Sequence, residues 1–267
     1  MARTLDQLSD LRDRVAIITG GGGHIGSTMA EALLELGATV VLVDLPSPRI
    51  EEAANRLRAG GRNVITKAVD LAESEDLRQM VRSVGIELGR IDILVNCAAL
   101  VGSADLKGWT TLFEEQREDV WRMALDVNLT AVFVMTQACT PWLRRSPGAS
   151  VINVSSIYGV VGPDWRLYEG TTLGNPAAYA ASKGGMVQLT RWLATTLAPA
   201  IRVNAISPGG VFRGTAEPFL SRYVERTPMA RMANEEDFKG AVAYLSSDLS
   251  AYVTGHNLLV DGGWTAW

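Results

Sequence analysis

The sequence predicts an α/β fold: a doubly wound, parallel sheet of seven strands with helices on both faces, formed by a single domain. Short, β-branched and apolar runs alternate with longer stretches of helical periodicity along the 267 residues. Parallel neighbouring strands need a long crossover, and the helical stretches provide one between successive strands. The runs are apolar on both faces, as expected for strands that helices cover on both sides.

Seven runs are predicted as strands: residues 15–18, 39–43, 63–69, 91–95, 150–154, 201–206 and 257–260. The clearest helical patterns follow the first three strands, at residues 25–36, 49–59 and 74–88. No repeat or linker divides the chain, so we expect one domain over residues 1–267. Within it, a cofactor-binding half (14–100) precedes a catalytic and substrate-binding half (101–267).

Composition and charge exclude several classes of protein. A hydrophobic share of 47% and a charged share of 20% are ordinary for a soluble globular chain. The net charge of -4 and the lack of a basic run argue against nucleic acid or an anionic membrane as partner. We expect no signal segment, and no run approaches the ~20 apolar residues of a membrane span. Cys97 and Cys139 lack metal-ligand spacing, which predicts two buried free thiols, no metal and a cytoplasmic protein.

A glycine-rich turn, Thr19 to Gly26, follows the first predicted strand and precedes a helix. Such a turn lets the backbone approach a pyrophosphate, and the helix N-terminus provides N–H groups and a positive partial charge. Its place between a strand and a helix indicates a dinucleotide site. The candidate cofactor-binding residues of this turn are Gly20, Gly22, Gly23, His24, Ile25 and Gly26.

Asp44 ends the second predicted strand. A carboxylate at this point can accept hydrogen bonds from both hydroxyls of an adenosine ribose, and it would repel a 2′-phosphate. Neither the glycine turn nor the residues immediately after Asp44 supply an Arg or Lys for a 2′-phosphate. The sequence therefore favours NAD over NADP as the cofactor.

Two further strand ends add weaker signals for the same ligand. Asp70, with Leu71 beside it, ends the third predicted strand, where a carboxylate could reach an adenine amino group. Asn96 and Ala98 end the fourth, where small residues leave room for the cofactor. Carboxyl ends of parallel strands meet at one edge of a sheet, so these residues are expected around one site.

Hydroxyl groups and a Tyr–Lys pair provide candidate chemistry. Ser155 and Ser156 close the fifth predicted strand, and Tyr179 and Lys183 lie four residues apart in a helical stretch. Positions i and i+4 share one face of a helix. We therefore expect the ammonium of Lys183 to lower the pKa of Tyr179 by stabilising its phenolate.

With these motifs in order, the sequence resembles the short-chain dehydrogenase/reductase family over essentially its full length. The matching segments, in order, are Thr19 to Gly26, NCAA (Asn96 to Ala99), VNL (Val127 to Leu129), Ser155–Ser156, YAASK (Tyr179 to Lys183), RVNAISPGG (Arg202 to Gly210) and VDGG (Val260 to Gly263). The resemblance implies a Rossmann-fold oxidoreductase that moves a hydride between the cofactor and a secondary alcohol or ketone.

The resemblance also implies a role for each matching residue. Tyr179 would be the general acid/base, Ser156 would hydrogen-bond the substrate oxygen with Ser155 as the alternative, and Lys183 would also bind the nicotinamide ribose. Asn128 would hold a water that continues the proton relay from Lys183. Pro208 and Gly209 would shape the nicotinamide pocket, with the backbone of Val211 near the carboxamide.

Four departures from the family pattern stand out. His24 replaces a usual glycine, where a positive φ would strain it; it either contacts the pyrophosphate or has a structural role. NCAA replaces NNAG, and Arg213 replaces a Thr that often contacts the nicotinamide. Residues 157–176 form an insertion between the serine pair and Tyr179, and with the long loop at 101–116 they are expected to form a lid.

The substrate is expected to be a polar, sugar- or polyol-like alcohol or ketone, because charged and aromatic residues gather around the pocket mouth; solvated loop charge is the alternative. These residues are Asp164, Trp165, Arg166, Tyr168, Glu169, Arg213, Glu217, Arg222 and Arg226. The loop pattern is also similar to a branch associated with bacterial surface-sugar pathways. Two other functions stay open: an NADPH-dependent 3-oxoacyl thioester reductase, and an NAD-binding sensor or scaffold without catalysis.

Family resemblance further implies a homotetramer or homodimer. The apolar C-terminal segment ends in Trp264 and Trp267, and exposed aromatic side chains suit a subunit interface. Packing of these side chains within the subunit is the alternative.

Overall fold

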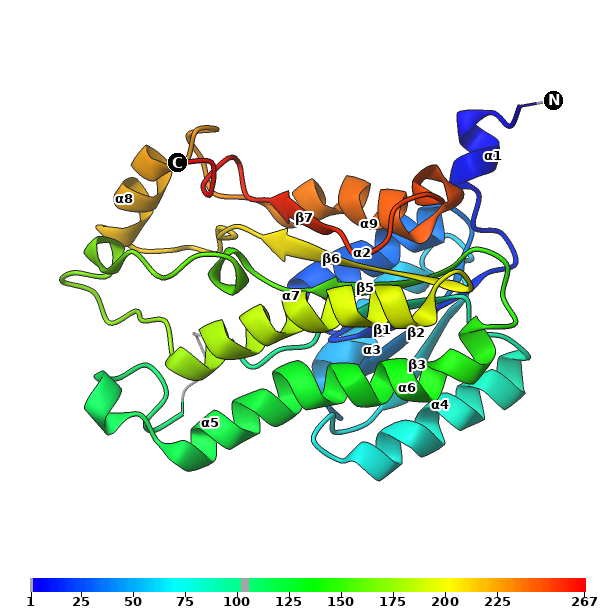
Figure 1. Ribbon diagram of the computed structural model, residues 1–267, viewed down its shortest axis with the longest axis horizontal. Helices are drawn as coiled ribbons and strands as arrows, with labels where there is room; N and C mark the ends of the chain where they lie inside the picture. The colour runs from blue at the N-terminus through cyan, green and yellow to red at the C-terminus, as the bar shows by residue number, and fades with distance from the viewer. Residues whose placement is uncertain (1, 102–105) are drawn as a thin grey trace.

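The computed structural model describes residues 2–101 and 106–267 and confirms a seven-stranded, all-parallel sheet (Figure 1). The strand order β3-β2-β1-β4-β5-β6-β7 reverses direction between β1 and β4. In open α/β sheets a ligand crevice forms at that reversal, outside the carboxyl ends of the strands. The strands are β1 (Val15–Thr19), β2 (Thr39–Asp44), β3 (Val64–Ala68), β4 (Ile93–Asn96), β5 (Ala149–Val154), β6 (Ile201–Pro208) and β7 (Asn257–Val260).

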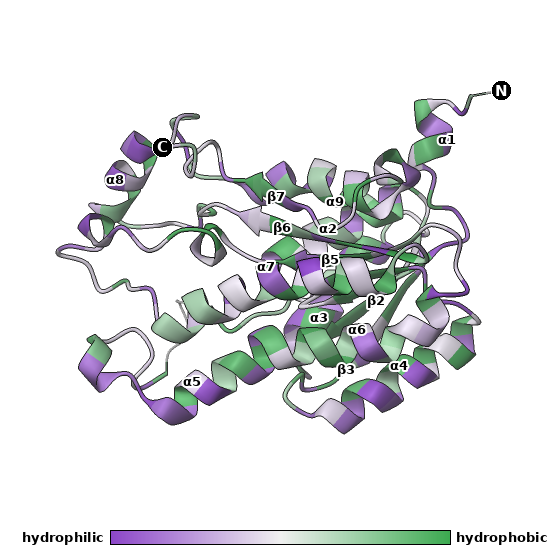
Figure 2. Ribbon diagram, in the orientation of Figure 1, coloured by the Kyte–Doolittle hydropathy of each residue, from purple (hydrophilic) through white to green (hydrophobic). Residues whose placement is uncertain are grey.

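Helices cover both faces of the sheet, as the apolar strands predicted. Alternate residues of β1 pack into different clusters: Ala16 and Ile18 into one, Val15 and Ile17 into the other. Figure 2 shows the hydrophobic strands between the two helical layers and hydrophilic stretches on the outer helices. The first cluster includes α2 (His24–Glu35), α3 (Pro48–Arg58) and α9 (Lys239–Ser246), and the second includes α4 (Ser74–Leu88), α6 (Ala131–Leu143) and α7 (Ala177–Leu197).

The predicted bounds of α4 and β7 match the structure, and most other bounds differ by one or two residues. The difference at β6 matters for the site. β6 continues two residues beyond the predicted end because Ser207 and Pro208 pair with Leu259 and Val260 of β7. This extra pairing carries Pro208 to the carboxyl edge of the sheet.

One long helical rod crosses the second face. α5 (Glu118–Leu125) continues into α6 through a π-helical turn, Asp126–Thr130, to give 26 residues over Glu118–Leu143. By length and composition this rod could cross a membrane, so the expectation that no such stretch exists was wrong. Its side chains Met135 and Cys139 are instead buried in the core against the sheet. The rod is a core helix of this fold.

A third hydrophobic cluster joins the insertion to α8 (Phe219–Arg226) and to the C-terminal segment. Trp264 is 2% exposed, lies stacked on Tyr223 with ring centroids 6.0 Å apart, and carries the Arg226 guanidinium 4.9 Å from its own centroid. The prediction of Trp264 as an exposed interface residue was therefore wrong, because these aromatic rings bury it within the subunit. Trp267 remains 71% exposed.

The loops that follow the strands gather at one end of the molecule, together with α8 and the first turns of α5 and α7 (Figure 1). Residues 102–105 of the long loop at 101–116 lie outside the described residues. The remaining short elements are α1 (Leu5–Ser9) and 3₁₀ turns at Phe113–Glu115, Ile157–Gly159, Trp165–Leu167, Glu235–Phe238 and Asp248–Ser250.

Candidate active site

The glycine turn after β1 needs glycine at two positions for different reasons. Gly20 has φ 70°, a left-handed conformation that suits glycine, and a Cβ there would meet the Ala98 backbone at 2.8 Å. A Cβ on Gly26 would lie 2.2 Å from the Gly20 carbonyl oxygen. Thr19 fastens the turn to the end of β4, because its hydroxyl accepts the N–H groups of Cys97 and Ala98 at 3.1 and 3.3 Å. The result is a bare backbone cradle at the N-terminus of α2, which fits a pyrophosphate.

Asp44 lies beside this cradle at the end of β2. Its Oδ2 accepts the Gly22 N–H at 2.9 Å and its Oδ1 accepts the Leu45 N–H at 2.8 Å. A Cβ on Gly22 would sit 3.1 Å from the same carboxylate. These contacts place a negative charge where the sequence predicted an adenosine ribose to bind.

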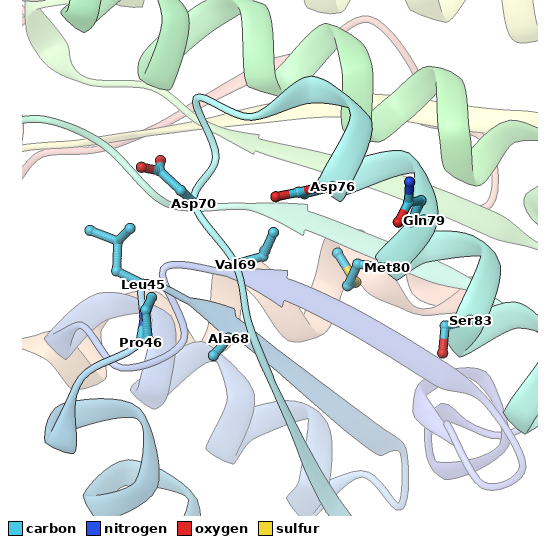
Figure 3. Close-up of a pocket in the computed structure, with 9 residues that line it drawn as sticks. All are labelled: Leu45, Pro46, Ala68, Val69, Asp70, Asp76, Gln79, Met80 and Ser83. Carbon is cyan, nitrogen blue, oxygen red and sulfur yellow. The ribbon is translucent and has the colours of Figure 1, made fainter.

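The predicted adenine end is only partly assembled by side chains. Asp70 is exposed and its carboxylate accepts the Ala72 N–H at 2.9 Å, whereas Leu71 is buried in the core, which leaves its backbone for the cofactor. A hollow of about 570 Å³ lies between the loop after β2, the end of β3 and α4 (Figure 3). It borders Asp70 but contains none of the proposed catalytic residues. Its lining is Leu45, Pro46, Ala68, Val69, Asp70, Asp76, Gln79, Met80 and Ser83.

The side chain of Asn96 is buried in a hydrogen-bond network of the protein. Its side-chain amide donates to Asn153 Oδ1 at 2.9 Å, and Asn153 donates in turn to Thr190 at 2.9 Å. This buried chain ties β4 to β5 and to α7, so Asn96 leaves only its backbone for the cofactor. Cys97 is half-buried rather than buried, and burial of its sulfur raises the thiol pKa to about 11; Cys139 is fully buried.

The structure separates the roles of the two serines. The hydroxyl of Ser155 donates to the Lys183 carbonyl at 2.9 Å, so it holds α7 against β5. Ser156 Oγ accepts the Tyr158 N–H at 3.2 Å, and Ser156 lies near enough to Tyr179 to lower the pKa of that phenol. Ser156 is therefore the serine beside the tyrosine.

Tyr179 and Lys183 lie on one face of α7, with the ammonium 5.7 Å from the centre of the phenol ring. Burial raises the pKa of Tyr179 despite the opposing effect of Ser156, so the expectation of a lowered pKa was wrong for this state. Burial likewise lowers the pKa of Lys183 to about 8, and its ammonium donates to the Val154 carbonyl at 2.8 Å. The ammonium of Lys183 thus binds the carbonyl at the end of β5 rather than the phenol oxygen.

Asn128 lies in the π-helical turn between α5 and α6, a feature that often marks functional sites. Its Oδ1 accepts the Leu100 N–H at 2.7 Å, and its Nδ2 donates to the Leu100 carbonyl and to Ser182 Oγ, both at 3.1 Å. Both side-chain atoms are thus held by the protein, so we expect the main chain of Asn128 to take any part in a proton relay.

The pairing of β6 with β7 fixes the positions of Pro208 and Gly209. Gly209 donates its N–H to the Val260 carbonyl at 2.9 Å. A Cβ on Gly209 would meet Asp261 at 2.9 Å, so this turn needs a small residue. Val211 forms an isolated parallel bridge with Ala233 and packs against the first core cluster. The turn after β6 is therefore fixed by its contacts with Val260, Asp261 and Ala233.

His24 and Arg213, two departures from the family pattern, meet at one carboxylate. Arg213 donates to Glu235 Oε1 at 3.0 Å, and His24 Nδ1 lies 4.0 Å from the same oxygen. His24 starts α2 without a positive φ, so the possible backbone strain is not present. Sequence reasoning missed Glu235, which sits in an ordinary-looking acidic stretch and is brought to the glycine turn because its 3₁₀ turn packs against α2 and Ala233 bridges to Val211.

Three of the four arginines predicted at the pocket mouth (Arg166, Arg222 and Arg226) contact the insertion itself. Asp164 binds Arg166 at 2.7 Å and Arg226 at 3.1 Å, and Arg222 donates to three backbone carbonyls of the insertion. The ion pair with Arg166 lowers the pKa of Asp164 to about 2. These contacts dock residues 157–176 against α8. They leave the insertion's aromatic side chains, rather than free cations, near Tyr179.

Together, the parallel sheet, the glycine cradle and the Ser156–Tyr179–Lys183 cluster define a nucleotide-binding Rossmann oxidoreductase. A family model described as enoyl-(acyl carrier protein) reductase matches residues 22–265. A probable galactose dehydrogenase of Rhizobium meliloti is 33% identical, with 96% of this chain and 97% of that protein covered. The chain belongs to the short-chain dehydrogenase/reductase family and acts on CH–OH groups.

Solved structures of relatives have the same fold but differ in cofactor. A dehydrogenase from Leptospira borgpetersenii with bound NAD⁺ is 33% identical at a TM-score of 0.84, covering 99% of this chain and 97% of that one. A gluconate 5-dehydrogenase from Burkholderia cenocepacia in complex with NADP and tartrate is 28% identical at a TM-score of 0.87, covering 99% and 100%. Both cofactors therefore occur among similar proteins.

Proposed function

We propose that this chain is an NAD-dependent dehydrogenase or reductase for a secondary alcohol or ketone that carries further hydroxyl groups. The observation that carries the cofactor assignment is the Asp44 carboxylate, held 2.9 Å from the Gly22 N–H at the edge of the glycine cradle. A fixed negative charge there favours a ribose with free hydroxyls and opposes a 2′-phosphate.

The proton path runs through groups of this chain. When bound, the nicotinamide supplies or accepts the hydride. Ser156 orients the substrate oxygen, and Tyr179, a neutral phenol because burial raises its pKa, donates a proton to that oxygen in ketone reduction. In alcohol oxidation the same phenol must first lose its proton, a step that its raised pKa opposes. Oxidation is accordingly favoured at higher pH than reduction.

Titration with NADH and NADPH, followed by nicotinamide fluorescence at fixed ionic strength, tests the cofactor assignment. The wild-type protein should bind NADH more tightly, because Asp44 repels the 2′-phosphate of NADPH. Asp44→Asn keeps an acceptor for Gly22 but removes the charge, so the preference should fall by about tenfold, equivalent to about 1.4 kcal/mol. Tighter binding of NADPH by the wild type would reject the assignment.

The main rival is an NADPH-dependent 3-oxoacyl thioester reductase, a type of activity close to the description of the matching family model. Asp44 counts against it, and a preference for NADPH in the titration would bring it forward. An NAD-binding sensor without catalysis is the other alternative. The presence of Ser156, Tyr179 and Lys183 in one cluster argues against that reading.

The exposed surface and the family resemblance support proposals for assembly and location. The face made by the α5–α6 rod and α7 carries exposed aromatic residues: Trp121, Phe133 and Trp192 are 38%, 41% and 56% exposed. Such a face suits burial between subunits, which supports a homotetramer or homodimer. Two free thiols suit the reducing cytoplasm, where we place the enzyme. Sedimentation at micromolar concentration would measure the assembly.

A further inference from the structure

A pair of tyrosine hydroxyls lies close to the catalytic phenol. The hydroxyls of Tyr158 and Tyr168 are 2.6 Å apart. Tyr158 lies two residues after Ser156 and donates its own N–H to Ser156 Oγ, so the pair is anchored to the reaction centre. The turn Ile157–Gly159, which carries Tyr158, packs against α7, which carries Tyr179, and the charge of a Tyr179 phenolate would raise the pKa of both tyrosines.

Asn175 adds a buried amide to this pair. It is 7% exposed, and neither its Oδ1 nor its Nδ2 has a hydrogen-bond partner among the described residues. It lies near enough to the Tyr168 hydroxyl to lower that group's pKa, without forming a hydrogen bond of normal geometry. A buried amide without partners is unfavourable for folding, and such groups in native proteins often belong to functional sites.

The hydrogen-bonding groups of this cluster match a hydroxyl better than a carboxylate. Two tyrosines have two hydroxyl hydrogens, one of which lies between them, so one hydrogen and several lone pairs remain. The amide of Asn175 offers both a donor and an acceptor. A substrate hydroxyl both donates and accepts and can satisfy the two ends of this amide, whereas a carboxylate can only accept.

The charged side chains around this cluster also favour an uncharged substrate group. Three arginines near the insertion already bind acceptors of the protein: Arg166 and Arg226 bind Asp164, and Arg222 binds backbone carbonyls. Among the buried side-chain nitrogens of these three arginines, only the Arg226 Nε, in a guanidinium that lies over the Trp264 ring, has no partner within the described residues. In the part of the chain that the structure describes, the tyrosine pair has aromatic neighbours instead, with Phe219 at 5.2 Å from the Tyr168 ring and Trp264 at 6.3 Å from the Tyr158 ring. An uncharged polar group of the substrate therefore fits this wall of the site.

We infer that Asn175, Tyr158 and Tyr168 form a subsite that binds a hydroxyl neighbouring the carbon that reacts, so that the enzyme selects vicinal diols or hydroxyketones. This inference rests on the proposed function and adds the residues that recognise the second hydroxyl. Asn175 and Tyr168 lie in the insertion between the serine pair and Tyr179, so the subsite is built by a segment that lengthens this loop.

Two alcohols that differ by one hydroxyl test this inference: cyclohexanol and cis-1,2-cyclohexanediol, each oxidised with NAD⁺ by wild type, Asn175→Leu and Tyr168→Phe. We expect the wild type to prefer the diol in kcat/KM by about tenfold or more, because a site built for a hydroxyl rejects an analogue that lacks it. Each variant should lose most of that preference. An unchanged ratio in both variants would overturn the subsite.

Thermal unfolding without ligand gives a readout independent of turnover. Asn175→Leu removes an amide without partners and should raise the melting temperature. The matched control is Asn204→Leu, whose amide donates to the Val253 carbonyl at 2.9 Å and accepts the His256 N–H at 3.0 Å, and which should melt lower. A lower melting temperature for Asn175→Leu would show a structural amide and overturn the subsite. Turnover of neither alcohol by the wild type, with NAD⁺ or NADP⁺, would instead count against the proposed function.

Discussion

The buried ammonium of Lys183, a single residue of the site, destabilises the folded protein. Its side chain is buried, with the residue 2% exposed, and burial lowers the pKa of its ammonium to about 8 from an ordinary 10.5. At pH 7 the folded protein therefore holds a charge that water would solvate better. A hydrogen bond to the Val154 carbonyl offsets part of this penalty.

Lys183→Met should therefore stabilise the protein at pH 7 while removing activity. The gain should be roughly 1–3 kcal/mol, since the favourable loss of a buried charge outweighs the lost hydrogen bond to Val154. In the wild type, the loss of stability caused by the buried ammonium is present in full below pH 8, where Lys183 is protonated in the folded chain. It disappears as the pH rises toward 10.5, because above pH 8 only the unfolded chain keeps the Lys183 proton, and near pH 10.5 it loses that proton too. Urea unfolding at pH 7 and pH 10 measures this, and an equal or larger gain at pH 10 would contradict it.

At the scale of elements, close packing between helices depends on single glycines. Gly85 of α4 faces Trp142 of α6, and a Cβ on Gly85 would lie 2.2 Å from the indole ring. Gly240 of α9 has no atom within 4 Å of the same position. The two glycines have the same helical propensity but opposite surroundings.

Gly85→Ala should destabilise the protein by about 1–3 kcal/mol, because the overpacked indole must move and this outweighs the better helix propensity of alanine. Gly240→Ala, the matched control, should stabilise by up to about 1 kcal/mol. Chemical denaturation of both variants measures the difference. Stabilisation by both substitutions would show that α4 and α6 are not packed as described.

Elements also show where sequence reasoning succeeds and where it fails. Periodicity predicted the strands and the first helices because their patterns are local. The environment of Tyr179 was not predictable, because the balance between burial, Ser156 and the Val154 carbonyl depends on how α7 packs on β5. Trp264 was misjudged for the same reason, since the aromatic rings that cover it come from the insertion and α8.

In the whole molecule, the active site lies at the carboxyl edge of the sheet, whereas a hydrogen-bond network that stabilises the fold lies at the amino edge. Asp92 lies just before β4, at the amino edge, and is fully buried. Its carboxylate accepts the Val15 N–H at 2.8 Å, binds Arg90 at 2.7 Å and hydrogen-bonds Ser146. Burial would raise the pKa of Asp92, but these hydrogen bonds outweigh it and lower the pKa.

Asp92→Asn should destabilise the protein by about 1–3 kcal/mol at pH 7 and leave the KM for the cofactor unchanged, because the site lies at the opposite edge. A carboxylate with a lowered pKa stabilises the fold above its ordinary value of 3.8, and this contribution is lost as the pH falls below it. The difference between wild type and variant should therefore shrink in acid. A difference that stays constant from pH 7 to pH 3 would contradict the assigned network.

Assembly of the site is also a property of the whole chain. The sequence placed the glycine turn, Asp44 and the Ser–Tyr–Lys residues correctly in one region, because parallel strand ends must meet at one edge. It could not pair His24 with Arg213 through Glu235, since 22 positions separate Arg213 from Glu235 along the chain. Nor could it show that Asn96 and Asn128 direct their side chains into hydrogen-bond networks of the protein itself.

In the proposed reaction Tyr179 exchanges the proton, while the glycine cradle, Asp44 and Lys183 hold the cofactor. Wild type and Tyr179→Phe should be compared by two readouts: NADH binding by fluorescence, and NADH formation from cis-1,2-cyclohexanediol by absorbance. We expect near-normal NADH affinity in the variant, with turnover reduced by about 10²–10⁴-fold, the usual contribution of a positioned acid/base. Turnover by Tyr179→Phe within a few-fold of the wild type would contradict this role of Tyr179.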